Sequence, residues 1–425
     1  MMWIHLFMVI SLLGSCSVQS YEWQQHYEDL KNRYSEKVLS EEHVEEMRPA
    51  GFRHPPFRCP DMSPSPSVPT SVEFVKAADI KAVAALGDSL TCGIGANASN
   101  VLGIPIEYRD VSYSIGGYGT YEDVITLANI LRLFNPNVLG PAPKSTLHGY
   151  PATLNDTGLN LAVTGHNTLN FSEQTRNLID TFKVYPGLSF QEDWKLVTVL
   201  IGMNDICDHC KNKTLFSVDN FIHYMTEALD MLMDEVPRLI VNVVQILSME
   251  PLRKAKRPTL GCQLQRSFCS CLVLPADGSP ELQEVVELNV EFQRRLEQLL
   301  YSGRYFKHDF AVVLQPYLTK AQPARKPDGQ LDLSFFAPDC FHFSIKGHEE
   351  LAKGLWNNMF QPEGEKFMIE SFTEPVKLAC PPGDHPYIYT RPKAAQGLTT
   401  TKSSDSAANS LPKLFLPLLA LAYLH

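Results

Sequence analysis

The sequence predicts an α/β fold, a three-layer α/β/α sandwich with a central parallel sheet. Short apolar runs alternate along the chain with longer segments whose apolar residues recur at helical spacing. Strands that alternate with helices form a parallel sheet that the helices cover on both faces. The predicted strands are residues 81–86, 196–201, 239–244 and 310–314, and the predicted helices are residues 121–134, 221–233, 282–300 and 347–360.

The first two predicted strands are defined by their composition and by the glycines that end them. Residues 81–86 read Lys-Ala-Val-Ala-Ala-Leu and stop at Gly87, while residues 196–201 read Leu-Val-Thr-Val-Leu-Ile and stop at Gly202. Apolar runs of this length suit strands that are buried on both faces. Because ligands of such sheets bind beyond the carboxyl ends of the strands, we expect a functional site just after these strands.

Length and charge limit the classes of protein to which the chain can belong. Its 425 residues, 44% of them hydrophobic, favour one large domain, which we place at residues 72–380. The formal net charge of -10 argues against a nucleic-acid partner, since binding phosphate backbones needs clustered Lys and Arg. Residues 116–119 are rich in glycine, but no strand leads into them and no Lys follows, so no nucleotide is expected.

The flanking segments favour the secretory pathway. Residues 1–20 resemble a signal peptide, with a retained signal anchor as the alternative. Residues 21–71 are predicted to form an extended lead-in, charged at first and then rich in proline. Residues 381–410 form a polar linker, and residues 411–425 form an apolar tail that matches a GPI-attachment signal, the alternative being an unstructured tail. We therefore expect an extracellular or cell-surface protein.

The cysteines agree with an oxidising compartment. The chain has 10 cysteines, and removal of the signal takes away Cys16 and leaves nine, most of them closely spaced, which usually indicates disulfides. Because nine is odd, one thiol is unpaired within the chain, and we expect it to be Cys92. Cys207 and Cys210 could instead belong to a zinc or redox motif, but no second Cys/His pair has ligand spacing, so no metal is expected. Glycosylation sequons lie at Asn97, Asn155, Asn170 and Asn212.

The first candidate for catalysis follows the first predicted strand. Residues 87–90 read Gly-Asp-Ser-Leu, so a strand, a tight turn and a helix would place Ser89 at the edge of the sheet. Gly87 permits the turn, and Asp88 can cap the helix. The free N–H groups at the start of that helix would face a developing oxyanion. The alternative is that Asp88 and Ser89 serve only as caps.

A serine hydroxyl needs a base within hydrogen-bond reach, and a loop before the last predicted helix supplies one. Residues 338–342 read Pro-Asp-Cys-Phe-His. Asp339 and His342, three apart in a turn, can place a carboxylate beside an imidazole, which fixes the tautomer and stabilises the imidazolium. His348 is the alternative base, although it falls inside the predicted helix.

Two further residues are candidates for stabilising negative charge. Residues 202–205 read Gly-Met-Asn-Asp and follow the second predicted strand, so the amide of Asn204 could donate to an oxyanion. A turn-forming role is the alternative for Asn204. Gly165 ends another apolar stretch, and its backbone N–H could approach the same oxyanion closely.

Together these pieces resemble the motif blocks of the GDSL, or SGNH, hydrolase family, and they occur in the family's order. The blocks are Ser89 in Gly-Asp-Ser-Leu, Gly165, Asn204 in Gly-x-Asn-Asp, and His342 in Asp-x-x-His. The resemblance implies a flavodoxin-like fold and hydrolysis of acyl esters without metal or cofactor. It implies that Ser89 is the nucleophile, His342 the base and Asp339 its orienting carboxylate. It also implies an oxyanion hole made of the Ser89 and Gly165 N–H groups and the Asn204 amide.

Four segments carry a closer likeness within the family: residues 113–117, 127–132, 134–136 and 338–344. They resemble animal membrane-associated phospholipases B, and the likeness covers roughly residues 72–380. It implies phospholipids or lysophospholipids as substrates and a membrane surface as partner. His166 after Gly165 and Cys92 after Ser89 depart from the usual pattern, which bears on the shape of the pocket. Two alternative functions remain. One is a short-chain or acetyl esterase that uses the same triad, and the other is a surface binding protein with an inactive site.

Overall fold

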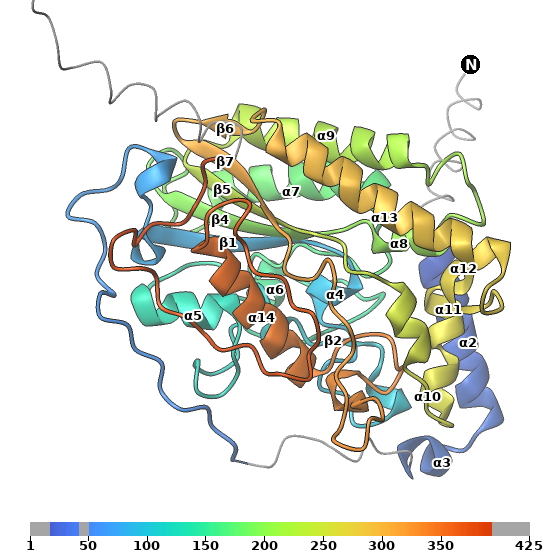
Figure 1. The fold of residues 1–425 in the computed structure, drawn as a ribbon. Helices are drawn as coiled ribbons and strands as arrows, with labels where there is room; N and C mark the ends of the chain where they lie inside the picture. The colour runs from blue at the N-terminus through green and yellow to red at the C-terminus, as the bar shows by residue number, and fades with distance from the viewer. Residues whose placement is uncertain (1–17, 42–50, 393–425) are drawn as a thin grey trace, which may run out of the picture.

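The computed structural model describes residues 18–41 and 51–392 (Figure 1). Most of the expected signal peptide lies outside the described residues, as do the linker beyond residue 392 and the whole apolar tail. In the part of the chain that is described, no helix has both the length and the apolar character that crossing a bilayer requires.

The core is a sheet of five strands, and the four predicted strands form its parallel part. The strand order is β1-β4-β5-β7-β6, with the first four strands parallel and β6 antiparallel to β7 at the edge. Strands β4, β5 and β7 are buried along their whole length, which explains their unbroken apolar sequences. The strands are β1 (Ile80–Gly87), β4 (Trp194–Leu200), β5 (Leu239–Val244), β6 (Phe306–Lys307) and β7 (Phe310–Gln315), while β2 (Ile106–Glu107) and β3 (Thr146–Leu147) form a separate antiparallel pair.

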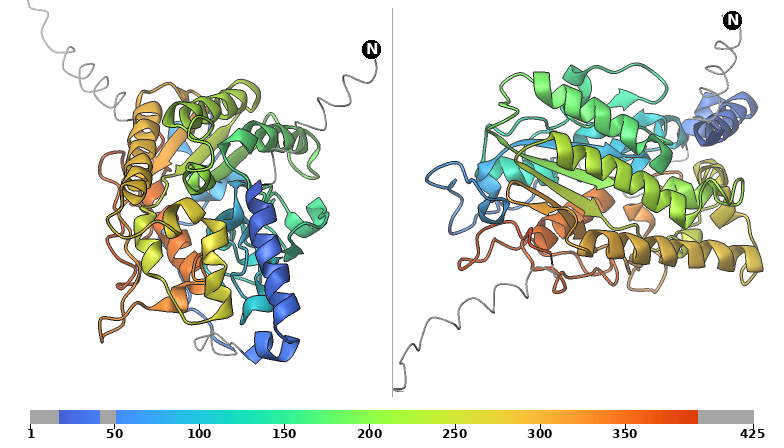
Figure 2. Two further views of the ribbon diagram at one scale, coloured as in Figure 1. Left: turned by 90° about the vertical axis from the view of Figure 1, so that its right-hand side faces the viewer. Right: turned by 90° about the horizontal axis from the view of Figure 1, so that it is seen from above.

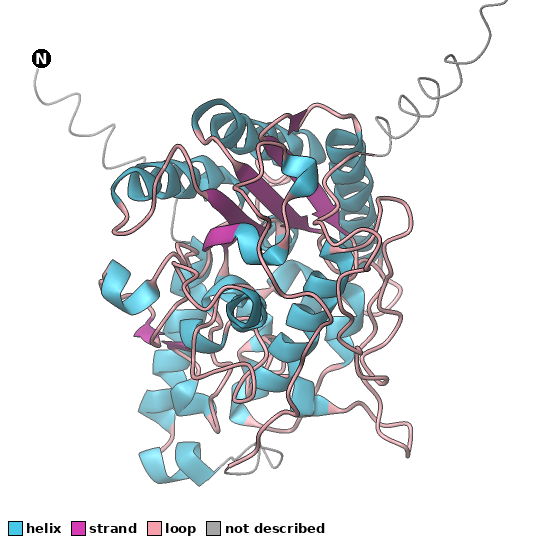
Figure 3. Cartoon of the chain, turned by 90° about the vertical axis from the view of Figure 1, so that its left-hand side faces the viewer, coloured by secondary structure: helices cyan, strands magenta, loops and turns pink. Residues whose placement is uncertain are grey.

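Helices cover both faces of the sheet, so the predicted three-layer sandwich is confirmed (Figures 1 and 3). Seen from above, three long helices lie in front of the strands (Figure 2, right). These are α7 (Phe171–Val184), α9 (Val218–Glu235) and α13 (Pro280–Tyr301), and the opposite face carries α5 (Leu127–Phe134) and α14 (Ile345–Met359). The short helices are α4 (Ser89–Cys92), α6 (Leu154–Thr157), α8 (Met203–Asp208), α10 (Leu260–Gln263), α11 (Gln265–Phe268) and α12 (Ser270–Val273).

The helices differ from the prediction in two places, and one of these differences has a local cause. The helix predicted over residues 121–134 begins only at Leu127, because the Thr126 side chain accepts a hydrogen bond from the Asn129 N–H and caps the helix there. Helix α7 was not predicted from the sequence, although Phe171, Leu178 and Phe182 on it are fully buried.

The predicted extended lead-in is wrong for its first half. Residues 18–33 form helix α2 (Val18–Arg33) and residues 36–41 form α3 (Glu36–Glu41). The buried side chains of α2 recur at spacings of four and three, as on one face of a helix. Those side chains, Trp23, Tyr27 and Leu30, join Leu264 and Phe268 in an apolar cluster separate from the main core.

Eight cysteines form four disulfides, and the predicted free cysteine is confirmed. Cys92 is unpaired and buried. Cys207 and Cys210 each pair with a cysteine of the 260–271 segment, so neither is left for the alternative zinc or redox motif. The disulfides are Cys59–Cys380, Cys207–Cys269, Cys210–Cys271 and Cys262–Cys340.

Candidate active site

Ser89 lies at the carboxyl end of β1, at the first turn of helix α4. Gly87 has a φ of 154°, and a Cβ there would collide with the Leu200 carbonyl oxygen, so the turn requires glycine. The Asp88 carboxylate accepts a hydrogen bond from the Leu90 N–H at 3.0 Å and caps the helix. Ser89 is thereby held at the rim of the sheet, and its N–H is one of those that a helix start leaves without an intrahelical partner.

A residue that the sequence did not single out fixes the turn before Ser89. The Gln174 amide, from helix α7, accepts from the Gly87 N–H at 2.9 Å and donates to the Gly87 carbonyl at 2.8 Å. The Gln174 amide nitrogen also lies 3.0 Å from Nδ1 of His166. No motif marks Gln174, because its role depends on how α7 packs against β1.

Asp339 and His342 lie on the loop before helix α14, and this loop places them beside Ser89. His342 Nε2 is 2.9 Å from Ser89 Oγ, and His342 Nδ1 is 2.6 Å from Asp339 Oδ2. The other oxygen of Asp339 accepts hydrogen bonds from the Phe341 and His342 N–H groups, each at 3.0 Å. The hydroxyl, imidazole and carboxylate thus form one continuous hydrogen-bonded chain, and all three residues are buried.

The alternative base, His348, does not reach this chain. His348 is buried within helix α14, where its Nδ1 accepts a hydrogen bond from the Tyr113 N–H at 3.3 Å. Burial is the main cause that lowers the pKa of His348 to about 3, so its ring is neutral near pH 7.

Asn204 lies on helix α8, just after β4, and shares a small pocket with Ser89. The Asn204 amide donates one N–H to the His166 carbonyl at 2.7 Å, which leaves its second N–H for a ligand. Gly165, with a φ of 85°, immediately precedes His166. The pocket is lined by Asp88, Ser89, Leu90, Met203, Asn204, Leu247, Met249, Leu252, Phe341 and Phe343.

Burial shifts the pKa of three groups around the site. Desolvation raises the pKa of Asp88 to about 7, although the hydrogen bond from Leu90 opposes the shift. Desolvation also raises the pKa of Asp205 to about 7, against two hydrogen bonds from Thr168. The pKa of His166 falls to about 4 because the ring is buried, so His166 is neutral near pH 7.

The four sequons differ in exposure. Asn97, Asn155 and Asn212 are exposed. Asn170 is buried, and its side chain accepts a hydrogen bond from the Asn167 N–H at 3.3 Å. Glycosylation at the three exposed asparagines remains a prediction, and Asn170 is a poor acceptor in the folded chain.

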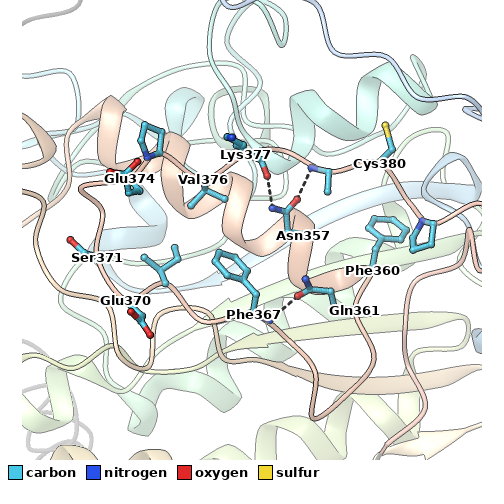
Figure 4. A pocket seen from close by; sticks show the side chains of 14 residues that line it. Asn357, Phe360, Gln361, Phe367, Glu370, Ser371, Glu374, Val376, Lys377 and Cys380 are labelled. Carbon is cyan, nitrogen blue, oxygen red and sulfur yellow. Dashed lines mark hydrogen bonds between the residues drawn. The ribbon is translucent and has the colours of Figure 1, made fainter.

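A larger hollow, about 650 Å³, lies between the end of helix α14 and the following segment (Figure 4). It is built largely from Phe360, Phe367 and Val376, and Asn357 fixes the segment by hydrogen bonds to the Lys377 carbonyl and the Ala379 N–H. Its lining includes no histidine beside a nucleophile. The chemistry is therefore assigned to the smaller pocket at Ser89.

A comparison with protein-family profiles identifies the family of the chain. The profile of the family described as GDSL-like lipase/acylhydrolase matches residues 83–355, more than half of the chain. The chain therefore belongs to the GDSL-like lipase/acylhydrolase family.

Curated relatives of the chain include two mammalian proteins named "Phospholipase B1, membrane-associated". The protein from Mus musculus is 42% identical over 364 residues, which is 83% of this chain and 24% of the relative. The protein from Homo sapiens is 42% identical over 347 residues, which is 80% of this chain and 24% of the relative. The chain thus spans about a quarter of the length of these relatives.

A solved structure gives a more distant match. A GDSL-like lipase from Parabacteroides merdae is 15% identical, with a TM-score of 0.35, over 67% of this chain and 96% of that one. At that TM-score the match adds nothing to the fold described above.

Proposed function

We propose that the chain is a serine esterase that hydrolyses the acyl ester bonds of phospholipids and lysophospholipids. The observation that carries the proposal is the hydrogen-bonded chain from Ser89 Oγ through His342 to Asp339. A serine becomes nucleophilic when a base lies within hydrogen-bond reach and a third group orients that base.

In the first step, Ser89 Oγ attacks the carbonyl carbon of the ester, and His342 Nε2 takes the hydroxyl proton. Asp339 accepts the hydrogen bond of the Nδ1–H, which keeps Nε2 unprotonated before the attack and stabilises the imidazolium afterwards. The negative charge on the substrate oxygen is met by the Ser89 N–H, the Gly165 N–H and the free N–H of the Asn204 amide. Collapse of this intermediate expels the alcohol, which takes the proton from His342.

In the second step, water attacks the acyl group on Ser89, and His342 again serves as the base. The acyl–oxygen bond to Ser89 then breaks, the proton returns to the serine oxygen, and a fatty acid is released. The chain's own side chains account for every proton transfer in this cycle, so the proposal needs neither a metal nor a cofactor.

Two observations support a lipid substrate. Seven of the ten residues that line the pocket at Ser89 are apolar, so the surface beside the nucleophile is largely hydrophobic, and the pocket itself encloses about 20 Å³. The relatives that match most of this chain are named as membrane-associated phospholipases B.

The compartment is part of the proposal. Four disulfides among the described residues favour an oxidising environment, as in the secretory route or outside the cell. We propose that the protein meets its substrate there, at a membrane surface.

Replacing Ser89 tests the proposal directly. Ser89→Ala removes the nucleophile, so fatty-acid release from a diacylphosphatidylcholine is expected to fall by about 10⁴-fold or more. The thermal midpoint should stay unchanged, and Ser302→Ala, at an exposed serine, is the matched control. Undiminished release from Ser89→Ala would refute the proposal.

The same preparations separate the alternative functions. Strong preference for a short-chain acyl ester over the phospholipid would favour a short-chain esterase. Failure of a fluorophosphonate to label the folded protein at Ser89 would favour a binding protein with an inactive site.

A further inference from the structure

A second hollow of about 650 Å³ borders the active site, between residues 147–154 and residues 160–166. We call it the 147–166 groove. It is joined to the site through two hydrogen bonds. The Asn160 amide, in the groove, donates to the Thr91 carbonyl of helix α4 at 2.9 Å, and the carbonyl of His166 accepts the Asn204 amide.

The floor of the groove contains charges that satisfy one another. Arg109 donates to Glu107 Oε2 at 2.7 Å and to the Ala162 carbonyl at 3.0 Å. Thr164 Oγ1 donates to the other oxygen of Glu107 at 2.6 Å. Because this buried pair is neutral overall and its hydrogen bonds are used internally, the floor has little to offer a charged ligand.

The rim of the groove, in contrast, exposes apolar side chains to water. Tyr150 is 70% exposed, Leu147 43%, Leu154 41% and Val163 39%, and all four line this one groove. Leaving such side chains in water is unfavourable by about 25 cal/mol per Å² of apolar surface. Exposed apolar groups gathered on one surface mark interaction sites, whereas single ones do not.

The charge of the molecule limits the kind of surface that the rim can bind. With a net charge of -10 the chain gains nothing from an anionic surface. Two charged residues close to the rim in the sequence, Lys144 and Asp156, are paired with each other at 3.1 Å. The most exposed residue of this apolar rim is a tyrosine. A tyrosine suits the boundary between lipid headgroups and acyl chains, because its ring is apolar and its hydroxyl can remain hydrated.

We propose that Leu147, Tyr150, Leu154 and Val163 form the surface by which the protein docks on a zwitterionic lipid interface, next to the pocket of Ser89. The proposal rests on the lipid esterase function proposed above and adds the surface through which that function reaches its substrate. The partner is the lipid surface, not a single substrate molecule or another protein.

The test compares a rim variant with a control variant. The rim variant is Leu147→Ser/Tyr150→Ser/Leu154→Ser. The control is Val68→Ser/Leu274→Ser/Val290→Ser, which removes three exposed apolar side chains, at 58%, 60% and 58%, none of which lines the groove. Asn155 borders the rim, so N-linked glycans are removed enzymatically from every preparation.

Binding to phosphatidylcholine vesicles is measured by co-sedimentation, with every variant also carrying Ser89→Ala. The lipid is then not consumed, and the result does not depend on turnover. The rim variant is expected to bind at least tenfold more weakly than the parent, while the control variant binds like the parent. A rim variant that binds like the parent, or a control variant that loses binding equally, would overturn the proposal.

Turnover with Ser89 restored gives a second readout. The ratio of turnover on phosphatidylcholine vesicles to turnover on a water-soluble ester is expected to fall at least tenfold in the rim variant and to remain unchanged in the control. If the proposed esterase function is wrong, the parent protein will hydrolyse neither phosphatidylcholine nor the water-soluble ester. The vesicle-binding comparison would still test the docking surface in that case, because it does not depend on turnover.

Discussion

Three buried aspartates lie near Ser89, and their hydrogen bonds differ. Asp339 accepts from two backbone N–H groups and from the imidazole of His342. Asp88 has a single backbone donor, and its Oδ2 has no hydrogen-bond partner among the described residues. Asp205 accepts two hydrogen bonds from Thr168, one from its N–H and one from its hydroxyl. At the level of residues, burial raises the pKa of Asp88 and of Asp205 to about 7, so these two carboxyl groups can hold a proton near neutral pH.

The raised pKa of Asp205 predicts how stability depends on pH. Its pKa is about 7 in the folded chain, against 3.8 for the ordinary group. Between pH 3.8 and pH 7, the carboxyl group is therefore protonated in the folded state and ionised in the unfolded state. The free energy of unfolding therefore falls as pH rises from about 4 to about 7. One pKa unit corresponds to about 1.4 kcal/mol, so this group accounts for up to about 2–3 kcal/mol between pH 5 and pH 7.

Asp205→Asn should reduce this pH dependence, since the neutral amide can accept from the Thr168 N–H through its oxygen and donate to the Thr168 hydroxyl through its nitrogen. Urea unfolding at pH 5 and pH 7 gives the difference in unfolding free energy, which we expect to be smaller in the variant. Asp234→Asn, at an exposed aspartate, should leave the difference unchanged. If the unfolding free energy changes by the same amount between pH 5 and pH 7 in Asp205→Asn and in the parent, Asp205 does not have the raised pKa.

At the level of elements, the sequence allowed prediction of those features whose cause is local. The four parallel strands were predictable because burial on both faces requires unbroken apolar runs. Ser89 was predictable as well, since a glycine turn and a capping aspartate precede it. Helix α2 was missed because its apolar stripe is narrow and lies within a strongly charged segment.

Features that depend on tertiary packing were not accessible from the sequence. Gln174 reaches Gly87 only because helix α7 packs against β1. The disulfide pairing could not be predicted, because many connectivities are compatible with the same cysteines. These pairs matter for the site, since two elements that carry site residues are tied to the same 260–271 segment.

The disulfide Cys262–Cys340 connects helix α10 to the loop between Asp339 and His342. Cys262→Ala/Cys340→Ala should lower kcat on a soluble ester about tenfold, because the loop that orients His342 loses its anchor and a misplaced base is costly. The variant should also lose about 2–5 kcal/mol of stability. The kcat is measured well below the unfolding transition, and the thermal midpoint is measured in a separate melt.

Cys59→Ala/Cys380→Ala is the matched control. Its disulfide closes a sequence separation of 321 residues, against 78 for Cys262–Cys340, so its removal should cost at least as much stability. Neither cysteine lines the pocket at Ser89, so kcat should be unchanged. Equal loss of kcat in both variants would show that stability alone, and not the position of the loop, controls activity.

At the scale of the whole molecule, the N-terminal helix α2 is connected to the active site through packed rings. Trp23 lies 5.3 Å from the ring of Phe268, and Phe268 meets the ring of His342 edge-on at 4.7 Å. Figure 1 shows α2 alongside the short helices α11 and α12, far from the strands of the sheet. The apolar cluster around Trp23 thus contacts the loop that carries Asp339 and His342 through Phe268 and Phe341.

This arrangement predicts that Trp23→Leu impairs catalysis although it replaces no residue of the site. Phe268 loses the ring behind it, so its edge-on contact with His342 loosens, and kcat on a soluble ester should fall several-fold at temperatures well below the thermal midpoint. Phe292→Leu is the control, because Phe292 is fully buried and stacks on Phe221 at 4.2 Å in the main core. Both variants should lose about 1–3 kcal/mol of stability, as large-to-small core substitutions do, but only Trp23→Leu should lose kcat. If Trp23→Leu melts earlier and keeps the parent's kcat, helix α2 stabilises the fold and has no part in holding His342.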